Sequence, residues 1–96
     1  MITNLDRSTI EEFVARPGIT LINWYSRRHP LSRLFDANYQ HASTRHPDVN
    51  FAEIDVTEDL EFAASWGVPR APELMGFRDG TLVFNHAGVL PERVVC

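Results

Sequence analysis

The stretch Ile19-Thr20-Leu21-Ile22-Asn23-Trp24-Tyr25-Ser26 decides the fold. β-Branched and aromatic residues dominate it and no residue is charged, which is typical of a central strand covered on both faces. A helical segment follows after Pro30 and extends to about His46. Its expected inward face consists of Leu31, Leu34, Phe35, Asn38 and Ala42. A buried strand that leads into a long helix indicates an α/β fold.

Upstream of this strand, the sequence predicts a short edge strand from Ile2 to Leu5 and then one helix. Ser8 and Glu11 have the spacing of a capping box, so we expect Ser8 to cap the helix and Glu11 to reach back. Pro17-Gly18 ends the helix. The apolar residues at helical spacing are Ile10, Phe13 and Val14.

Downstream, strand and helix alternate again. Val49 to Val56 is predicted as a strand anchored by Phe51 and Ile54. Thr57 is expected to cap the next helix, and Gly67 to end it. The expected buried stripe of this helix consists of Leu60, Ala63, Ala64 and Trp66.

The last part of the chain predicts a hairpin. Glu73 to Phe77 and Thr81 to His86 are short strands joined by Asp79-Gly80, a strong turn signal that we assign no further role. A last helix of about one and a half turns is expected after Pro91. The predicted order β-α-β-α-β-α-β-β-α indicates one α/β domain, residues 1–96, with a mixed sheet and helices on both faces.

Composition excludes several classes of function. The chain has 96 residues and a formal net charge of −4, which argues against nucleic-acid binding by the whole domain. No apolar run approaches the roughly 18 residues of a membrane span, and the N-terminus lacks a signal-peptide pattern, so we expect a cytoplasmic protein without membrane contact. The single cysteine, Cys96, excludes an internal disulfide and a cysteine-based zinc cluster.

Four local strings, in order, resemble the thioredoxin family over nearly the whole chain. Leu21 to Tyr25 looks like the central strand that runs into the family's active-site helix, and Phe51 to Val56 looks like its third strand. Trp66 to Pro72 resembles the segment with the family's cis-proline, which places Pro72 at that position. Phe77 to Gly80 resembles the hairpin that follows. The resemblance implies a thioredoxin-like fold whose C-terminal helix is truncated.

The resemblance ends at the family's Cys-Gly-Pro-Cys motif. The matching positions are His29-Pro30-Leu31-Ser32, so both cysteines are missing. The family's buried aspartate matches Asn23, which cannot titrate, and the tryptophan before its motif matches Arg28. Because disulfide exchange needs an attacking thiolate and a resolving thiol, we expect no dithiol catalysis within one chain and no cofactor.

Three residues before the long helix suggest a binding site. Arg27, Arg28 and His29 precede a helix N-terminus, where free N–H groups attract anions, and guanidiniums add bidentate donors. This arrangement predicts a pocket for a carboxylate, a phosphate or an acidic peptide. Alternatively, both arginines are solvated surface charges. Ala71 and Pro72 match the edge along which the family binds extended peptides, so the resemblance implies that peptide binding can survive without redox chemistry. Alternatively, Pro72 only shapes the core.

Other candidate residues carry weaker signals. His29 and Ser32 lie one turn apart, but no nucleophile-elbow motif is present, so helix capping is the better interpretation than hydrolysis. The histidines (His29, His41, His46 and His86) lack metal-ligand spacing, so we expect no metal. Cys96 is a candidate reactive thiol. The aromatic residues that indicate a core and not a nucleotide platform are Trp24, Tyr25, Phe35, Phe51 and Phe77.

The sequence leaves three functional hypotheses. The first is a redox-inactive module for protein interaction, chaperoning or assembly, whose contact surface is Arg27, Arg28, His29, Ala71 and Pro72. The second is a divergent thiol–disulfide or glutathione-linked oxidoreductase in cell redox homeostasis that uses His29 and Ser32 together with an outside thiol. The third is a structural subunit that forms a homodimer, because Val94 and Val95 cover little of one sheet face.

Overall fold

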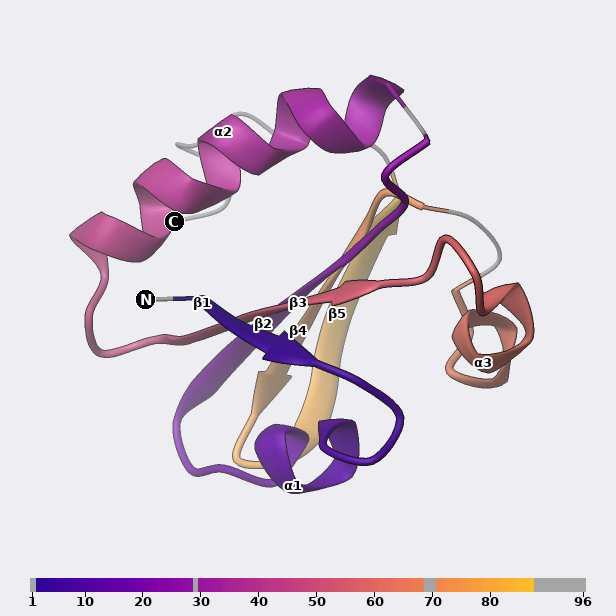
Figure 1. Ribbon diagram of the computed structural model, residues 1–96. Coiled ribbons are helices and arrows are strands. Elements are labelled where there is room, and N and C mark those ends of the chain that lie inside the picture. The colour runs from indigo at the N-terminus through magenta and orange to yellow at the C-terminus, as the bar shows by residue number, and fades with distance from the viewer. Residues whose placement is uncertain (1, 29, 69–70, 88–96) are drawn as a thin grey trace.

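The computed structural model describes residues 2–28, 30–68 and 71–87, and for residues 30–35 it describes the backbone alone (Figure 1). Its elements are β1 (Ile2–Leu5), α1 (Ile10–Val14), β2 (Ile19–Tyr25), α2 (Pro30–Arg45), β3 (Asn50–Asp55), α3 (Leu60–Ser65), β4 (Glu73–Arg78) and β5 (Thr81–Ala87). This order confirms the prediction as far as β5. The truncated last helix predicted after Pro91 lies outside the described residues.

The five strands form one mixed sheet in the order β1-β3-β2-β4-β5. β2 is central, as predicted, and pairs in parallel with β3 and antiparallel with β4. The residues from Leu21 to Trp24 are buried. A strand with neighbours on both edges and helices on both faces can be apolar throughout, which explains its sequence.

Helices cover both faces of the sheet, α2 on one side and α1 and α3 on the other (Figure 1). On the α1/α3 face the buried sheet residues are Leu5, Ile22, Trp24, Ala52, Ile54, Met75 and Phe77. On the α2 face they are Leu21, Phe51 and Leu74. Because side chains alternate along a strand, Asn23 and Tyr25 share the α2 face with Leu21.

Tyr39 anchors α2 to the sheet. Its hydroxyl lies 2.7 Å from the carbonyl oxygen of Ala52 and 2.9 Å from that of Leu21, so it can donate to either strand. Burial raises the pKa of Tyr39 far above its usual value, which keeps the hydroxyl a donor. The sequence prediction named Asn38 and Ala42 on this face but missed Tyr39; Ala42 is fully buried and Asn38 is half-buried. The side chains of Leu31, Leu34 and Phe35 lie outside the described part.

The predicted capping box of α1 is wrong. Thr9 is the N-cap residue, without a side-chain capping bond. The Asp6 carboxylate instead accepts hydrogen bonds from the Ser8 N–H (2.8 Å) and the Ser8 hydroxyl (2.6 Å). The hydrogen bonds of Ser8 are thus made to the acidic side chain two residues earlier, and Ser8 does not cap the helix.

The predicted start of α3 is also wrong. Asp59, and not Thr57, is the N-cap residue, and its carboxylate accepts from the Phe62 N–H at 3.3 Å. The later start shifts the buried stripe. Leu60 is 63% exposed and Ala64 is exposed, whereas Ala63 is buried and Phe62 and Trp66 pack against the core, as predicted for Ala63 and Trp66. The rings of Phe62 and Trp66 pack against Trp24, at centroid distances of 6.0 and 6.2 Å.

The turn at Asp79-Gly80 is confirmed as a hairpin turn. Both residues have positive φ, 50° and 85°, the combination that a two-residue type I′ turn requires. Asp79 also has a second role that the sequence prediction denied. Its carboxylate accepts from the Gly18 N–H at 2.7 Å, which ties the hairpin to the loop before β2.

Candidate functional site

The carboxyl end of β2 lies between the carboxyl end of β3 and the start of β4. The register pairs Tyr25 with Asp55 and Trp24 with Glu73. The chain that leaves β2 therefore passes beside the β3–α3 loop on one side and beside Pro72 on the other. This place coincides with the binding surface predicted from Arg27, Arg28, Ala71 and Pro72.

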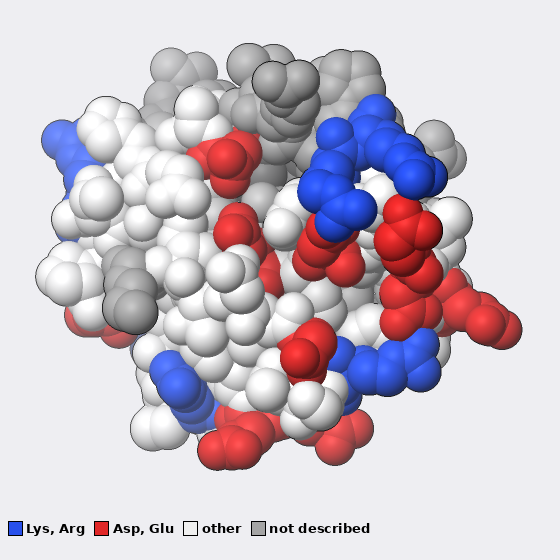
Figure 2. Space-filling model, in the orientation of Figure 1, with Lys and Arg blue, Asp and Glu red and all other residues white. Residues whose placement is uncertain are grey.

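Arg27 and Arg28 are ion-paired with acidic residues of the chain itself. The Arg27 guanidinium pairs with Asp55 and lies 3.9 Å from Glu58, and Arg28 lies 3.1 Å from Glu58. Figure 2 shows basic and acidic side chains side by side on this part of the surface. The arginine side chains remain 60% and 76% exposed, so their remaining N–H donors can still meet a partner.

Asp55 is the centre of this ion-paired cluster. Its carboxylate accepts from the Thr57 N–H (2.9 Å), from the Thr57 hydroxyl (2.5 Å) and from Arg27. The Thr57 hydroxyl in turn accepts from the Arg27 N–H at 2.9 Å. Burial alone raises the pKa of Asp55, but the bonds from Thr57 and Arg27 outweigh it, so the pKa is lowered. The cluster fixes the path of the chain just beyond β2.

Ala71 and Pro72 are joined by a cis peptide bond, at the position that the resemblance assigns to the family's cis-proline. Both residues are buried, and Ala71 belongs to the core on the α1/α3 face. Their backbone, and not their side chains, is what they can offer to a partner. His29 and Cys96 lie outside the described residues, and Pro30, Leu31 and Ser32 are described by their helical backbone alone.

Among the described residues, three buried side-chain atoms lack a hydrogen-bond partner: Asn23 Oδ1, Trp24 Nε1 and Glu73 Oε2. All three lie on consecutive positions of β2 or on the residue paired with Trp24. Buried polar groups are nearly always paired, so each of these atoms is unusual. They lie on opposite faces of the sheet: Asn23 on the α2 face, and Trp24 with Glu73 on the α1/α3 face.

Glu73 is the most buried carboxylate of the described chain, at 3% exposure. Burial raises its pKa, and Asn85 and His86 of β5 offset only part of that rise. The sequence prediction placed Glu73 in a strand but gave it no role. A charged residue that follows a proline and opens the apolar run Leu-Met-Gly-Phe was the available signal.

Glu53 is another carboxylate that the sequence prediction missed, and it makes no ion pair in the described chain. It lies in the middle of β3, in register with Asn23 of β2, and is half-buried. Burial raises its pKa first, and the charges of Asp36 and Asp55 raise it further. The signal was a glutamate at an inward position of a strand that otherwise buries apolar residues.

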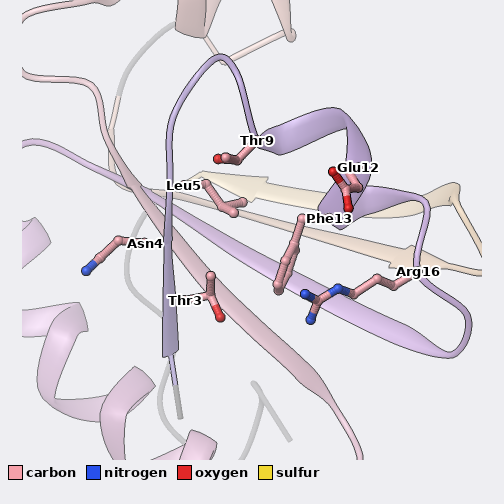
Figure 3. Close-up of a pocket in the computed structure, with 7 residues that line it drawn as sticks. All are labelled: Thr3, Asn4, Leu5, Thr9, Glu12, Phe13 and Arg16. Carbon is pink, nitrogen blue, oxygen red and sulfur yellow. The ribbon is translucent and has the colours of Figure 1, made fainter.

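A separate hollow lies on the α1/α3 face between β1 and α1 (Figure 3). Leu5 and Phe13 contribute its apolar wall, and the Arg16 guanidinium lies 4.3 Å from the centre of the Phe13 ring. Its volume of about 200 Å³ is below the roughly 300 Å³ at which ligand sites begin, so we assign no ligand to it.

The sequence family model named Thioredoxin matches residues 1–95. The chain belongs to the thioredoxin family. A protein of Streptomyces coelicolor named "Putative thioredoxin 2" is 27% identical over 88 residues, which are 92% of this chain and 66% of that protein. The chain thus spans slightly less than two thirds of this relative.

Solved thioredoxin structures share the fold. Mitochondrial thioredoxin 3 of Saccharomyces cerevisiae, in its oxidised form, superposes with a TM-score of 0.86 at 21% identity, covering 98% of this chain and 90% of that one. Thioredoxin f2 of Chlamydomonas reinhardtii gives a TM-score of 0.87 at 16% identity, covering 99% and 91%. These values confirm the predicted thioredoxin-like fold. The match of His29 and Ser32 to the family's cysteine positions stays a prediction.

The described residues contain no group of three or more His, Cys, Asp or Glu residues arranged to hold a metal ion. In the same part of the chain, no helix combines the length and the apolar character that crossing a bilayer demands.

Proposed function

We propose that the chain is a binding module of the thioredoxin family, which holds an extended segment of a protein partner beside Ala71–Pro72 and performs no two-cysteine redox chemistry. The cysteine content carries the proposal. Cys96 is the single cysteine, so one chain cannot supply both an attacking and a resolving thiol. We expect this function in the cytoplasm.

The geometry of β4 supports the proposed contact. Its ladder with β2 ends at the Trp24–Glu73 pair, so Ala71 and Pro72 precede the paired residues. An extended peptide can add its backbone to such a segment. Arg27 and Arg28 leave β2 at the same end of the sheet. Because a guanidinium has five N–H donors, each arginine can hold Asp55 or Glu58 and still bind an acidic side chain of the partner.

Two measurements test this proposal. In the insulin-reduction assay with dithiothreitol, we expect no acceleration over dithiothreitol alone, and Cys96→Ser should behave identically. In an NMR titration with acidic and neutral extended peptides of equal length, we expect saturable shifts at the amides of Arg27, Arg28, Ala71 and Glu73. The acidic peptide should bind more tightly, and Arg27→Ala with Arg28→Ala should remove that preference. Insulin reduction, or no shift at these amides, would overturn the proposal.

A divergent oxidoreductase is the second candidate, because the similar Streptomyces protein is named as a thioredoxin. The Cys96 thiolate would attack oxidised glutathione, forming a mixed disulfide and releasing one glutathione thiolate. This candidate predicts disulfide turnover that depends on glutathione and is lost in Cys96→Ser. Turnover that persists in Cys96→Ser would exclude Cys96 as the reacting thiol and leave an outside thiol, and a wild-type chain without glutathione-dependent turnover would exclude the candidate.

A homodimerising subunit is the third candidate, favoured by exposed apolar side chains on β5. Leu82, Val83 and Phe84 are 49%, 58% and 41% exposed. Sedimentation equilibrium at about tens of micromolar should then show a dimer that Val83→Glu converts to monomer. A wild-type chain that is monomeric at that concentration contradicts this candidate.

A further inference from the structure

Asn23 and Glu53 form a polar pair under α2, in the middle of the sheet. The two residues are in register on parallel neighbouring strands, so their side chains leave the same face next to each other. That face is the one covered by α2, because Leu21, two residues before Asn23, packs with Tyr39. Glu53 is in register with Asn4 on its other side, so the polar row reaches edge strand β1.

Negative charge gathers around this pair. Asp36 lies on α2 and Asp55 lies two residues further along β3, and both raise the pKa of Glu53 in addition to its burial. Burial also raises the pKa of Tyr25, and the charges of Glu53, Asp55 and Asp36 raise it further, whereas the charge of Arg27 offsets part of that rise. Figure 2 shows acidic surface near the middle of the view, below the position that α2 has in Figure 1. The potential here favours a cation.

The acceptors of this pair lack donors. Asn23 is 1% exposed and its Oδ1 has no hydrogen-bond partner. Within the described part of the chain, Glu53 and Asp36 make no ion pair, whereas Asp55 is held by Arg27. An amide oxygen that is unpaired and buried to this degree, near two carboxylates that make no ion pair, can accept hydrogen bonds from a ligand that donates several.

We propose that Asn23, Glu53 and Asp36 form a binding site for one cationic side chain of a partner, the ammonium group of a lysine or the guanidinium of an arginine. An ammonium group carries three N–H donors, which matches two carboxylates and one amide oxygen. Asp36 is exposed and Glu53 is half-buried, so the cation approaches from solvent and meets Asn23 at the floor. The described acidic residues do not converge as a metal site does, which favours an organic cation over a metal ion.

This site does not depend on peptide binding at Ala71–Pro72. In sheet order, Glu53 in β3 and the start of β4 lie on opposite sides of β2. A cationic side chain can therefore bind here whether or not an extended segment docks at the cis-proline. The two sites are also distinguishable by which amides respond to a ligand.

The experiment is an NMR titration of the ¹⁵N-labelled chain with two capped tripeptides, acetyl-Ala-Lys-Ala-amide and its norleucine counterpart. We expect the lysine peptide to shift the backbone amides of Asn23 and Glu53 and the side-chain amide of Asn23, and the norleucine peptide to shift none of them. Glu53→Gln and Asp36→Asn should each weaken lysine-peptide binding by about two- to fivefold, the size expected for one partly solvated ion pair.

Asp48→Asn is the matched control, because Asp48 is an exposed acid in the turn before β3. It should leave the affinity unchanged. Since Asp36 is exposed, Asp36→Asn keeps the test valid if Glu53→Gln disturbs folding. Equal shifts from both peptides, unchanged affinity in the Glu53 and Asp36 variants, or shifts confined to the surroundings of Glu58 would overturn the proposal.

Discussion

Glu53 and Asp55 lie two residues apart on β3, on the same face of the sheet, yet in opposite environments. Asp55 accepts three hydrogen bonds from Thr57 and Arg27, and its pKa is lowered. Glu53 has no such partners, and its pKa is raised. Two carboxylates at equivalent strand positions thus differ because one has donors and the other has none. The ion-paired cluster of Asp55 fixes the path of the chain beyond β2, whereas the unpaired Glu53 can accept hydrogen bonds from the proposed cation.

The largest effect on this comparison should come from Asp55→Ala. It removes the acceptor of two Thr57 donors and of Arg27, and we expect a loss of about 1–2 kcal/mol in the free energy of unfolding at pH 7. Because the folded-state pKa of Asp55 is lowered, its contribution is present above the ordinary aspartate value and is lost as the pH falls through the folded-state pKa. Urea unfolding at pH 7 and at low pH measures both effects. A pH-independent loss would show that Asp55 acts through packing alone.

Glu73→Gln should stabilise the chain by about 1 kcal/mol at pH 7, because a buried carboxylate with one unpaired oxygen becomes a neutral amide. Burial raises the folded-state pKa of Glu73, so in the wild type stability falls as the pH rises from the ordinary glutamate value toward the folded-state pKa. The gain should therefore vanish below the ordinary value, where both residues are neutral. Chemical denaturation at several pH values checks this sign. Destabilisation at pH 7 would mean that the interactions of Glu73 with Asn85 and His86 outweigh the cost of burying its charge.

Glu53→Gln should change stability less, by a few tenths of a kcal/mol, because Glu53 is half-exposed and solvent screens its charge. Its sharper effect is on Tyr25. After burial, the Glu53 charge is the largest cause that raises the pKa of Tyr25, so removing the charge should lower that pKa. Titration of Tyr25, followed by NMR of its ring, reads the shift directly. An unchanged Tyr25 titration would place Glu53 away from it.

Arg28→Ala should have the smallest effect on stability, within about 0.5 kcal/mol, because its pair with Glu58 is between two largely exposed side chains. Arg27→Ala is the matched comparison and should cost more, since Arg27 binds the half-buried Asp55. Thermal denaturation of both variants shows which substitution causes the larger loss of stability. Equal losses would contradict the difference between a surface pair and the Asp55 cluster.

The sequence predicted the fold because local signals agreed with global packing. The apolar run of β2, the Asp79-Gly80 turn and Gly67 each had one consistent interpretation, and all are confirmed. The start of α1 was missed because a neighbouring side chain took the hydrogen bonds that the predicted cap needed. The Asp6 carboxylate accepts from the N–H and the hydroxyl of Ser8. Asn23 was singled out for its position, but its unmet oxygen could not be predicted. Glu53 and Glu73 were missed because the neighbours of a charged residue in a sheet depend on strand register. Register depends on how separate strands pair, so it cannot be predicted from one segment of the sequence.

Tyr39 anchors α2 to the sheet near the middle of the helix, so a tilt of the helix about this point displaces its first turn. α2 spans 16 residues, and Tyr39 is the tenth, so the first residue lies about 14 Å along the helix axis from Tyr39. The Tyr39 hydroxyl contacts carbonyl oxygens of β2 and β3. A tilt of about 5° around this fulcrum moves the first turn by about 1 Å, enough to change how a bound group is positioned. A tyrosine that touches no ligand thereby sets the geometry of the end of the helix where ligands would bind.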